Sequence, residues 1–357
     1  MDRSTPRVAL AFIITAYAVL PAFAAQRTFV STTGVDNAAC SLGAPCRAFA
    51  AAITATTAGG EVIVLDSGGY GRVTITKSVS IIAPAGIHAG ISVFAATNGI
   101  DIPTGGIKVV LRGLAITGQG GVHGIYVTGN NALTIERCDI SGMGTNGVFL
   151  DNVSGTLQMR DTVVHDNGGN GVFFFGPLSA TLDHVSIERN ALAGVSAYDG
   201  GMISIKDSAL VRNDRGVDIA TLTAGVTTTV NGDGLQISRN NHEGLRASAS
   251  AGRVYIGLVR STVDFNVGGA LIQVTGAAGR ATGTFVSNAF PANGNWSTYV
   301  DRGPGAVNSA QALIMGNYMT GGVANIYGVT GGYYRSGGGN SVEPDSAYFA
   351  PDETTTF

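Results

Sequence analysis

Four short runs in the middle of the chain repeat one phrase: Gly147-Val148-Phe149-Leu150, Gly171-Val172-Phe173-Phe174, Gly194-Val195-Ser196-Ala197 and Gly216-Val217-Asp218-Ile219. Similar runs open at Gly99, Gly124, Gly244 and Gly269. Successive glycines of this set are 22 to 28 residues apart. A self-similar period of this length is typical of a solenoid, in which each repeat buries its apolar face against the next one. The repetition therefore predicts a stack of coils.

A second phrase lies at a fixed position inside each repeat. Two apolar residues five positions apart, such as Leu182 and Ile187, are followed after three more residues by an asparagine. Because the period is kept, these asparagines should form one internal column, in which side-chain amides hydrogen-bond from coil to coil. The predicted ladder consists of Asn167, Asn190, Asn213, Asn240, Asn266 and Asn293.

The content of each repeat decides between types of solenoid. Each repeat offers three short runs rich in Val, Ile and Phe, separated by turns of Gly, Asn and Asp. Leucine-rich repeats have a similar period but carry a leucine-dense consensus. Three strands per coil predict an all-β, single-stranded parallel β-helix of about nine or ten coils. The expected core includes Ile135, Ile140, Val148, Leu150, Val164, Val172, Ile187 and Ile205.

Two stretches carry a resemblance to known proteins. These are residues 73–84, Val-Thr-Ile-Thr-Lys-Ser-Val-Ser-Ile-Ile-Ala-Pro, and residues 109–116, Val-Val-Leu-Arg-Gly-Leu-Ala-Ile. They and the repeats resemble secreted bacterial members, of unassigned function, of the pectin-lyase-like superfamily. The resemblance extends over about residues 27–345 and implies a right-handed coil, in keeping with the usual hand of parallel crossovers. That superfamily includes lyases, hydrolases, esterases, epimerases, adhesins and phage tailspikes, so the fold alone implies no activity.

The first 24 residues have the pattern of a secretory signal peptide. Arg3 and Arg7 precede an apolar run over residues 8–20, and Ala22-Phe23-Ala24 fits the cleavage rule, so the mature chain should begin at Ala25. The run is too short to span a membrane, and no membrane span is expected elsewhere. The sequence thus predicts a secreted or periplasmic protein.

Composition limits the class of partner. Charged residues make up 13% of the chain, glycine accounts for 53 of 357 residues, and the net charge is −3. Removal of residues 1–24 takes away one acid and two bases, which changes the charge to −4. A mildly acidic chain of this kind argues against nucleic acid as a partner.

The chain has three cysteines. Cys40 and Cys46 lie six residues apart in a loop, and after export a local disulfide between them is expected. Cys138 falls at a small, inward position of its coil, equivalent to Thr162 and Ser208, and should be a buried free thiol.

The two ends of the solenoid differ from its middle. Residues 25–70 should form an N-terminal cap and a first strand, with a helix over residues 45–57 covering the open end of the coil. The β-helix itself is expected over residues 71–342, with a tail at 343–357. Residues 291–308, which include the only tryptophan, are expected to form an inserted loop.

Alternation along each Gly-apolar-x-apolar strand places one column of residues on the outside. It runs through three aromatic side chains, Tyr126, Phe149 and Phe173, and continues to a group with an acid and a base. In families that this chain resembles, the equivalent sheet often carries the carbohydrate groove. Aromatic side chains suit sugar surfaces, and carboxylates suit hydroxyl groups or a bridging cation. The candidate substrate-binding residues are Tyr126, Phe149, Phe173, Tyr198 and Asp151, and the candidate catalytic residues are Asp199, Asp218 and Arg246.

The same residues have a purely structural interpretation. Exposed aromatic rings on a β-solenoid stack on one another across coils, and an acid–base pair on neighbouring coils forms a surface ion pair. Two further charged columns recur once per coil. Asp166, Arg189, Arg212 and Arg239 could contact an anionic polymer or pair with nearby acids, and the second column alternates in sign: Arg137, Asp161, His184 and Asp207.

Two classes of function follow. The first is an exported protein that binds an extracellular polysaccharide, anionic ones included, through the outward face of one sheet; cleavage by a lyase or hydrolase reaction is left open. No cofactor is required by the sequence, and calcium is the candidate ion. The second is a non-catalytic, adhesin-like stalk. Signature strings of polygalacturonases, pectate lyases and alginate epimerases (Gly-His-Gly, Trp-x-Asp-His and Asp-Pro-His) do not occur in the chain, and its oligomeric state is left undetermined.

Overall fold

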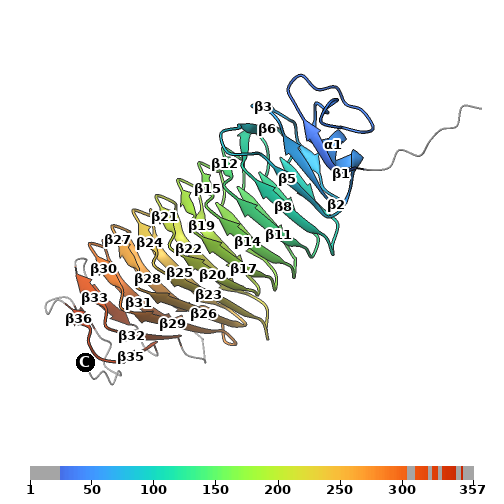
Figure 1. Ribbon diagram of the computed structural model, residues 1–357. Coiled ribbons are helices and arrows are strands. Elements are labelled where there is room, and N and C mark those ends of the chain that lie inside the picture. The colour runs from blue at the N-terminus through green and yellow to red at the C-terminus, as the bar shows by residue number, and fades with distance from the viewer. Residues whose placement is uncertain (1–24, 304–309, 321–323, 329–331, 343–346, 349–357) are drawn as a thin grey trace, which may run out of the picture.

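A computed structural model describes residues 25–303, 310–320, 324–328, 332–342 and 347–348. The chain winds into one long solenoid whose coils stack from the N-terminal to the C-terminal end (Figure 1). Each full coil contributes one strand to each of three parallel sheets, here called sheets I, II and III in the order in which the chain visits them. The expected all-β parallel solenoid is confirmed.

The strands of each sheet are neighbours in the stack, although they are one coil apart in sequence. Sheet I contains β1 (Ala25–Val30), β2 (Thr56–Val64), β5 (Val79–Ile82), β8 (Lys108–Arg112), β11 (Ala132–Glu136), β14 (Thr156–Arg160), β17 (Ser179–Asp183), β20 (Met202–Lys206), β23 (Thr227–Asp233), β26 (Arg253–Val259), β29 (Arg280–Val286), β32 (Ala310–Met315) and β35 (Gly332–Ser336). Sheet II contains β3 (Gly68–Gly69), β6 (Ala89–Phe94), β9 (Leu114–Gln119), β12 (Asp139–Ser141), β15 (Val163–His165), β18 (Ser186–Glu188), β21 (Ala209–Val211), β24 (Gln236–Ser238), β27 (Thr262–Asp264), β30 (Ala289–Pro291), β33 (Tyr318–Thr320) and β36 (Ser341–Val342). Sheet III contains β4 (Val73–Thr74), β7 (Ile100–Ile102), β10 (Ile125–Val127), β13 (Val148–Asp151), β16 (Val172–Phe175), β19 (Ala193–Tyr198), β22 (Arg215–Thr221), β25 (Glu243–Ala249), β28 (Gly268–Val274), β31 (Trp296–Arg302), β34 (Ala324–Gly328) and β37 (Ala347–Tyr348).

The core fills the inside of the coil, and the repeated glycine is what allows it to pack. All eight predicted core residues are buried. In most coils the glycine that opens the sheet III strand lies under a β-branched residue of sheet II. A Cβ added to Gly124 would stand 2.6 Å from Cγ2 of Ile140, and one added to Gly147 would stand 2.5 Å from Cγ1 of Val164. Real side chains do not approach so closely, so the coil can turn this corner only with glycine.

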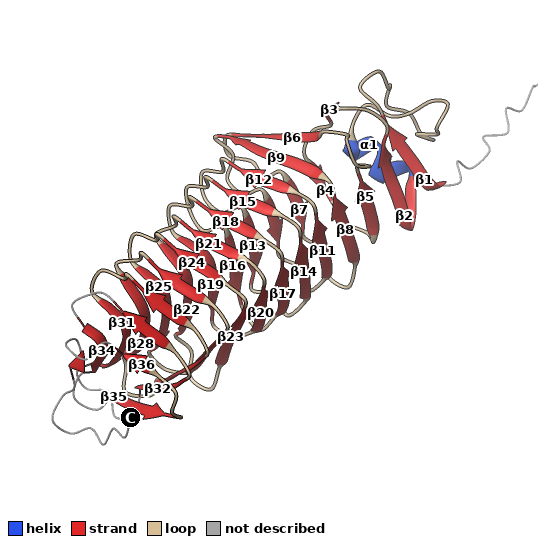
Figure 2. Ribbon diagram, turned by 60° about the vertical axis from the view of Figure 1, so that its left-hand side comes forward, coloured by secondary structure: helices blue, strands red, loops and turns tan. Residues whose placement is uncertain are grey.

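A short helix covers the N-terminal end of the solenoid (Figure 2). Helix α1 spans Phe49–Ala55 and buries Phe49, whose ring lies 5.2 Å from that of Tyr70. The predicted helix over 45–57 is too long, because the helix begins four residues after Pro45 and ends two residues before Thr57. Sheet I also begins earlier than expected, because β1 pairs with β2 in parallel. The cap at 25–70 thus shares its first sheet with the solenoid.

The C-terminal coils are more regular than the sequence indicates. The expected insertion at 291–308 contains β31, which pairs with β28 and β34 in sheet III. Within the predicted tail at 343–357, the described residues 347–348 form β37 and pair with β34. Nothing in the described ranges is a helix of the length and hydrophobicity needed to cross a bilayer. The predicted signal peptide at 1–24 lies outside the described residues.

The predicted asparagine ladder is present and buried. Nδ2 of Asn167 donates to Oδ1 of Asn190, and Nδ2 of Asn190 donates to Oδ1 of Asn213, both at 2.9 Å. The column continues through backbone or side-chain donors to Asn293. A second ladder, which the sequence did not reveal, joins Asn288, Asn317 and Asn340 at the corner between sheets I and II.

Removal of one ladder asparagine should lower stability. The Asn213→Ala variant deletes the acceptor that Asn190 uses and the donor that binds the carbonyl oxygen of Ile187. Since both groups are buried, we expect the free energy of unfolding to fall by about 1–3 kcal/mol. Urea unfolding would measure the loss. Asn241→Ala, at an exposed neighbouring position, serves as the control, and equal stability of the two variants would contradict the ladder's role.

The cysteines behave as predicted. Cys40 and Cys46 form a disulfide whose Cα atoms are 4.8 Å apart. Cys138 is a buried free thiol, and burial raises its pKa to about 11. It therefore stays protonated at neutral pH and acts as a small apolar residue.

Both charged columns of the sequence analysis occupy the corners of the coil. Arg137, Asp161, His184 and Asp207 turn the chain from sheet I to sheet II, and Asp166, Arg189, Arg212 and Arg239 turn it from sheet II to sheet III. All eight have a positive φ, between 44° and 57°. This left-handed conformation is unfavourable for residues other than glycine. The backbone geometry of the corner therefore fixes where these side chains stand, whatever contacts they then make.

Candidate functional site

The strands of sheet III place the predicted aromatic column on the outer wall. Tyr126, Phe149 and Phe173 are direct register partners on β10, β13 and β16. Their neighbours on either side along each strand, such as Val148 and Leu150, point inward and are buried. All three rings are half-buried. The column is therefore partly open to solvent.

The rings stack on one another along the axis of the solenoid. Phe149 and Phe173 are nearly parallel, with 4° between their planes and 4.9 Å between their centroids. Tyr126 lies 5.5 Å from Phe149, and Tyr198 meets Phe173 edge to face at 5.5 Å. Each ring therefore covers part of its neighbour's face. The wall presents ring edges and hydroxyl groups to solvent more than open ring faces.

One end of the column is completed by His123 and Asp151. The imidazole of His123 stacks on Tyr126, with the centroids 5.1 Å apart. The hydroxyl of Tyr126 donates to Oδ2 of Asp151 at 2.8 Å. Burial lowers the pKa of His123, and burial together with the Asp151 hydrogen bond raises the pKa of Tyr126 to about 12. Near pH 7 this end carries a neutral imidazole and a neutral phenol beside Asp151. His123 was not among the residues selected from the sequence.

The other end of the column is an ion pair held by a tyrosine. Nε and Nη2 of Arg246 donate to the two carboxylate oxygens of Asp218 at 2.7 and 2.8 Å. The hydroxyl of Tyr198 donates to Oδ2 of Asp218 at 3.0 Å. Burial tends to lower the pKa of Arg246, but the pairing with Asp218 outweighs it and raises that pKa. Arg246 is thus held protonated, which suits an anion contact and not a general base.

Asp199 lies apart from this pair. It sits at the turn after β19, and its Oδ1 accepts backbone N–H groups of Leu222 and Thr223 at 2.6 and 2.9 Å. Its carboxylate organises the turn of the next coil. The structure therefore brings together Asp218 and Arg246 but leaves Asp199 outside their cluster. Catalysis by any of the three remains a prediction.

A further charged cluster lies at the start of β22 and β25, three residues before Asp218 and Arg246. Arg215 bridges Oε2 of Glu243 at 2.8 Å and Oδ2 of Asp214 at 2.9 Å, and Nδ1 of His242 lies 2.6 Å from Oδ1 of Asp214. Sequence reasoning missed this cluster. The signal was available, because each repeat glycine here follows a charged residue, in Asp214-Arg215-Gly216 and His242-Glu243-Gly244.

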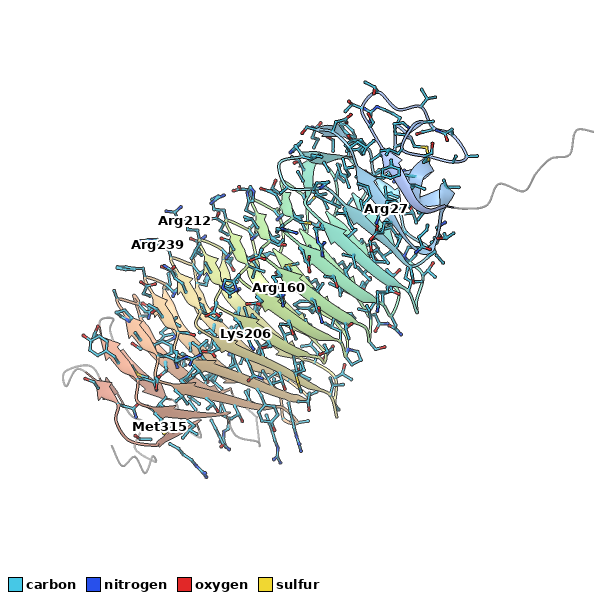
Figure 3. All side chains as sticks on the ribbon, viewed as in Figure 1. Arg27, Arg160, Lys206, Arg212, Arg239 and Met315 are labelled. Atoms are coloured by element: carbon cyan, nitrogen blue, oxygen red, sulfur yellow. A yellow bond between two sulfur atoms is a disulfide. The ribbon has the colours of Figure 1, made fainter. Side chains whose placement is uncertain are left out.

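Several side chains of the charged corner columns have a partner close by. Arg189 pairs with Asp166 at 2.9 Å and with Glu188 at 2.6 Å, and the guanidinium of Arg239 lies 5.4 Å from the centre of the Phe265 ring. Arg212 and Arg239 project from the solenoid at this corner (Figure 3). In the other column, Nδ1 of His184 contacts its sequence neighbour Asp183 at 2.7 Å.

Carboxylate and imidazole groups close enough to share one ion occur at Asp183, His184 and Asp207, whose ligand atoms lie within 4.8 Å of one another. This group is at the corner between sheets I and II, away from the aromatic column. His184 and Asp207 are exposed and Asp183 is half-buried, and Oδ2 of Asp183 is also 3.5 Å from Nε of Arg160. The calcium expected from the sequence stays a prediction.

Comparison with known proteins places the fold. Residues 123–330 match the family described as right handed beta helix region. Pectate lyase Pel9A has a similar solved structure, with a TM-score of 0.56 and 17% identity over 91% of this chain and 82% of that protein. The catalytic unit of a thermostable GH87 α-1,3-glucanase from Streptomyces thermodiastaticus strain HF3-3 has a TM-score of 0.57 and 18% identity over 84% of this chain and 66% of that one. No curated protein sequence matches this chain. These findings confirm the right-handed parallel β-helix, a fold that this chain shares with a pectate lyase and an α-1,3-glucanase.

Proposed function

We propose that this chain, which belongs to the right-handed β-helix family, binds an extracellular polysaccharide along the outer wall of sheet III. The observation that carries the proposal is the continuous band of His123, Tyr126, Phe149, Phe173 and Tyr198, in which neighbouring rings are 4.9–5.5 Å apart. The band follows the axis of the solenoid. An extended sugar chain could therefore lie along it and contact several coils at once.

The chemistry of the band suits a carbohydrate. Half-buried ring edges offer apolar contact, while the Tyr126 and Tyr198 hydroxyls, Asp151 and the Asp218–Arg246 pair offer hydrogen bonds at both ends of the column. Sugars present both kinds of surface, so mixed aromatic and charged walls recognise them well. Two structurally similar proteins are named as a pectate lyase and an α-1,3-glucanase, which supports a saccharide ligand.

Under this proposal the protein is exported and binds the polysaccharide, and cleavage is not part of the proposal. The Cys40–Cys46 disulfide supports an oxidising compartment. Arg246 serves as a clamp for an anionic sugar, because its pairing with Asp218 keeps it charged. Asp151 would supply oxygen atoms for a bridging calcium ion, because both carboxylate oxygens of Asp218 already accept from Arg246.

Loss of the central aromatic rings should weaken glycan binding. Since Phe149 and Phe173 also support each other, leucine is the better replacement, because it keeps apolar volume in the wall. Two aromatic contacts, worth about 0.5–1.5 kcal/mol each, correspond to roughly a tenfold loss of affinity in Phe149→Leu/Phe173→Leu. A glycan array on the mature protein would identify the ligand, and calorimetry would measure the change.

Tyr255→Leu is the matched control, since Tyr255 is an exposed aromatic residue on the outer wall of sheet I. It should bind like the wild type. The array is run with calcium and with a chelator to test whether binding depends on calcium. Unchanged binding in the double variant would overturn the proposed site, and no glycan binding under either condition would favour the stalk function instead.

A further inference from the structure

The turns that lead from sheet III to sheet I form a cleft across three successive coils. These turns follow β22, β25 and β28, and the cleft has a volume of about 430 Å³. Small turn residues line it together with Thr227, Arg253 and Arg280. The lining therefore contains two cationic side chains and no acidic one. Its volume is in the range of small-ligand sites.

The two arginines are stacked without a counter-ion. Arg253 on β26 is the register partner of Thr227 on one side and of Arg280 on the other. Strands of neighbouring coils lie roughly 4.8 Å apart, and both side chains are exposed. Neither has an ion-pair or side-chain hydrogen-bond partner among the residues that the structure describes. Like charges placed opposite each other on adjacent strands are destabilising.

Elsewhere in the solenoid, several arginines pair with an acid on a neighbouring coil. Arg112 pairs with Glu136 at 2.7 Å, and Arg260 pairs with Asp233 at 2.6 Å. At Arg253 and Arg280 the corresponding space is the open cleft. Gly225, on its rim, has a φ of 79° and no atom within 4 Å of the position where a Cβ would stand. The turn thus leaves room beside the guanidinium groups.

We propose that this cleft binds an oxyanion group, a carboxylate or a sulfate, between Arg253 and Arg280. Two guanidinium forks can each give a pair of charge-assisted hydrogen bonds to such a group, and the Thr227 hydroxyl can give one more. Binding relieves the repulsion between the arginines. This site goes beyond the proposed function, since it lies in the turns and not on the wall of sheet III, and it assigns a negative charge to its ligand.

The test uses three polymers with one backbone: dextran sulfate, carboxymethyl-dextran and neutral dextran. The full mature chain should bind the two charged polymers, with affinity that falls as sodium chloride rises, and should not bind dextran. Arg253→Gln/Arg280→Gln should weaken both interactions at least about tenfold, because each removes charge-assisted hydrogen bonds. Arg260→Gln, which removes an exposed arginine that has its own acid, should leave binding unchanged.

Competition with sodium sulfate shows whether the cleft binds a free anion or an anionic group on a polymer. Displacement of dextran sulfate at millimolar sulfate assigns the cleft to a free ion, and displacement only by polymer assigns it to an anionic chain. The Phe149→Leu/Phe173→Leu variant should retain this binding, which separates the cleft from the aromatic wall. Equal affinity of the wild type and the double arginine variant, or no binding of either charged polymer, would overturn the proposal.

Discussion

Replacement of Arg246 by alanine should lower the free energy of unfolding by about 3 kcal/mol, near the lower end of the range for a broken buried ion pair. The Asp218 side chain is 8% exposed, whereas that of Arg246 is 27% exposed. Without Arg246, the carboxylate keeps only the Tyr198 hydroxyl among its charged and side-chain partners. An uncompensated charge then stays in a poorly hydrated place. Urea unfolding would measure the loss.

The control is Arg260→Ala, at the corner that follows β26. Arg260 pairs with Asp233 at 2.6 Å, but the two side chains are 70% and 40% exposed. Water and salt screen such a pair, so its removal should cost no more than about 1 kcal/mol. Equal effects of the two variants would contradict the burial argument. The result also bears on function, because a loss of glycan binding in Arg246→Ala could then be separated from a loss of fold.

Replacement of Ile140 by alanine should lower the free energy of unfolding by about 2–5 kcal/mol. Ile140 is fully buried on β12 and lies over the Gly124 backbone. Its register partners Ile116 and Val164 belong to strands that are hydrogen-bonded above and below. The coils cannot move together to fill the space, since each is held in a continuous ladder. The cavity should therefore remain, and its cost should add to the lost burial.

Val163→Ala is the matched control for this variant. Val163 lies on the next strand of the same sheet but points outward and is half-buried. Its truncation leaves no internal cavity, so we expect a change below about 1 kcal/mol. Thermal or urea unfolding would measure the loss of unfolding free energy in both variants. A loss for Val163→Ala as large as that for Ile140→Ala would mean that the inward and outward positions are wrongly assigned.

The fold could be predicted from the sequence because a solenoid turns sequence distance into spatial contact. Residues one period apart become neighbours, so a pattern such as Asn167, Asn190 and Asn213 is already a list of contacts. The two ends of the solenoid could not be predicted in this way, because they lack the repeat that turns the sequence into contacts. Residues 45–57 and 296–302 lack the glycine-led repeat, and helix α1 and strand β31 depend on packing against the coils next to them.

The candidate site was predicted as a set of positions and not as a set of interactions. The column of Tyr126, Phe149 and Phe173 follows from strand alternation and the period. That the rings stack with their faces together depends on side-chain rotamers and on the twist between coils. The separation of Asp199 from Asp218 depends on a turn whose carboxylate binds backbone amides.

The sequence by itself determined the period, the three strands per coil, the inward and outward faces, the asparagine column and the Cys40–Cys46 disulfide. Each of these arises from local rules that repeat with the chain. Only the tertiary structure decided which charges meet. Arg246 pairs with Asp218 and Arg189 with Asp166 on neighbouring coils, whereas Arg253 stands beside Arg280 in register and an open cleft lies next to both. The reason is that the repeat length varies from 22 to 28 residues, and this variation is absorbed in the turns. The turns therefore set which side chains stand opposite one another.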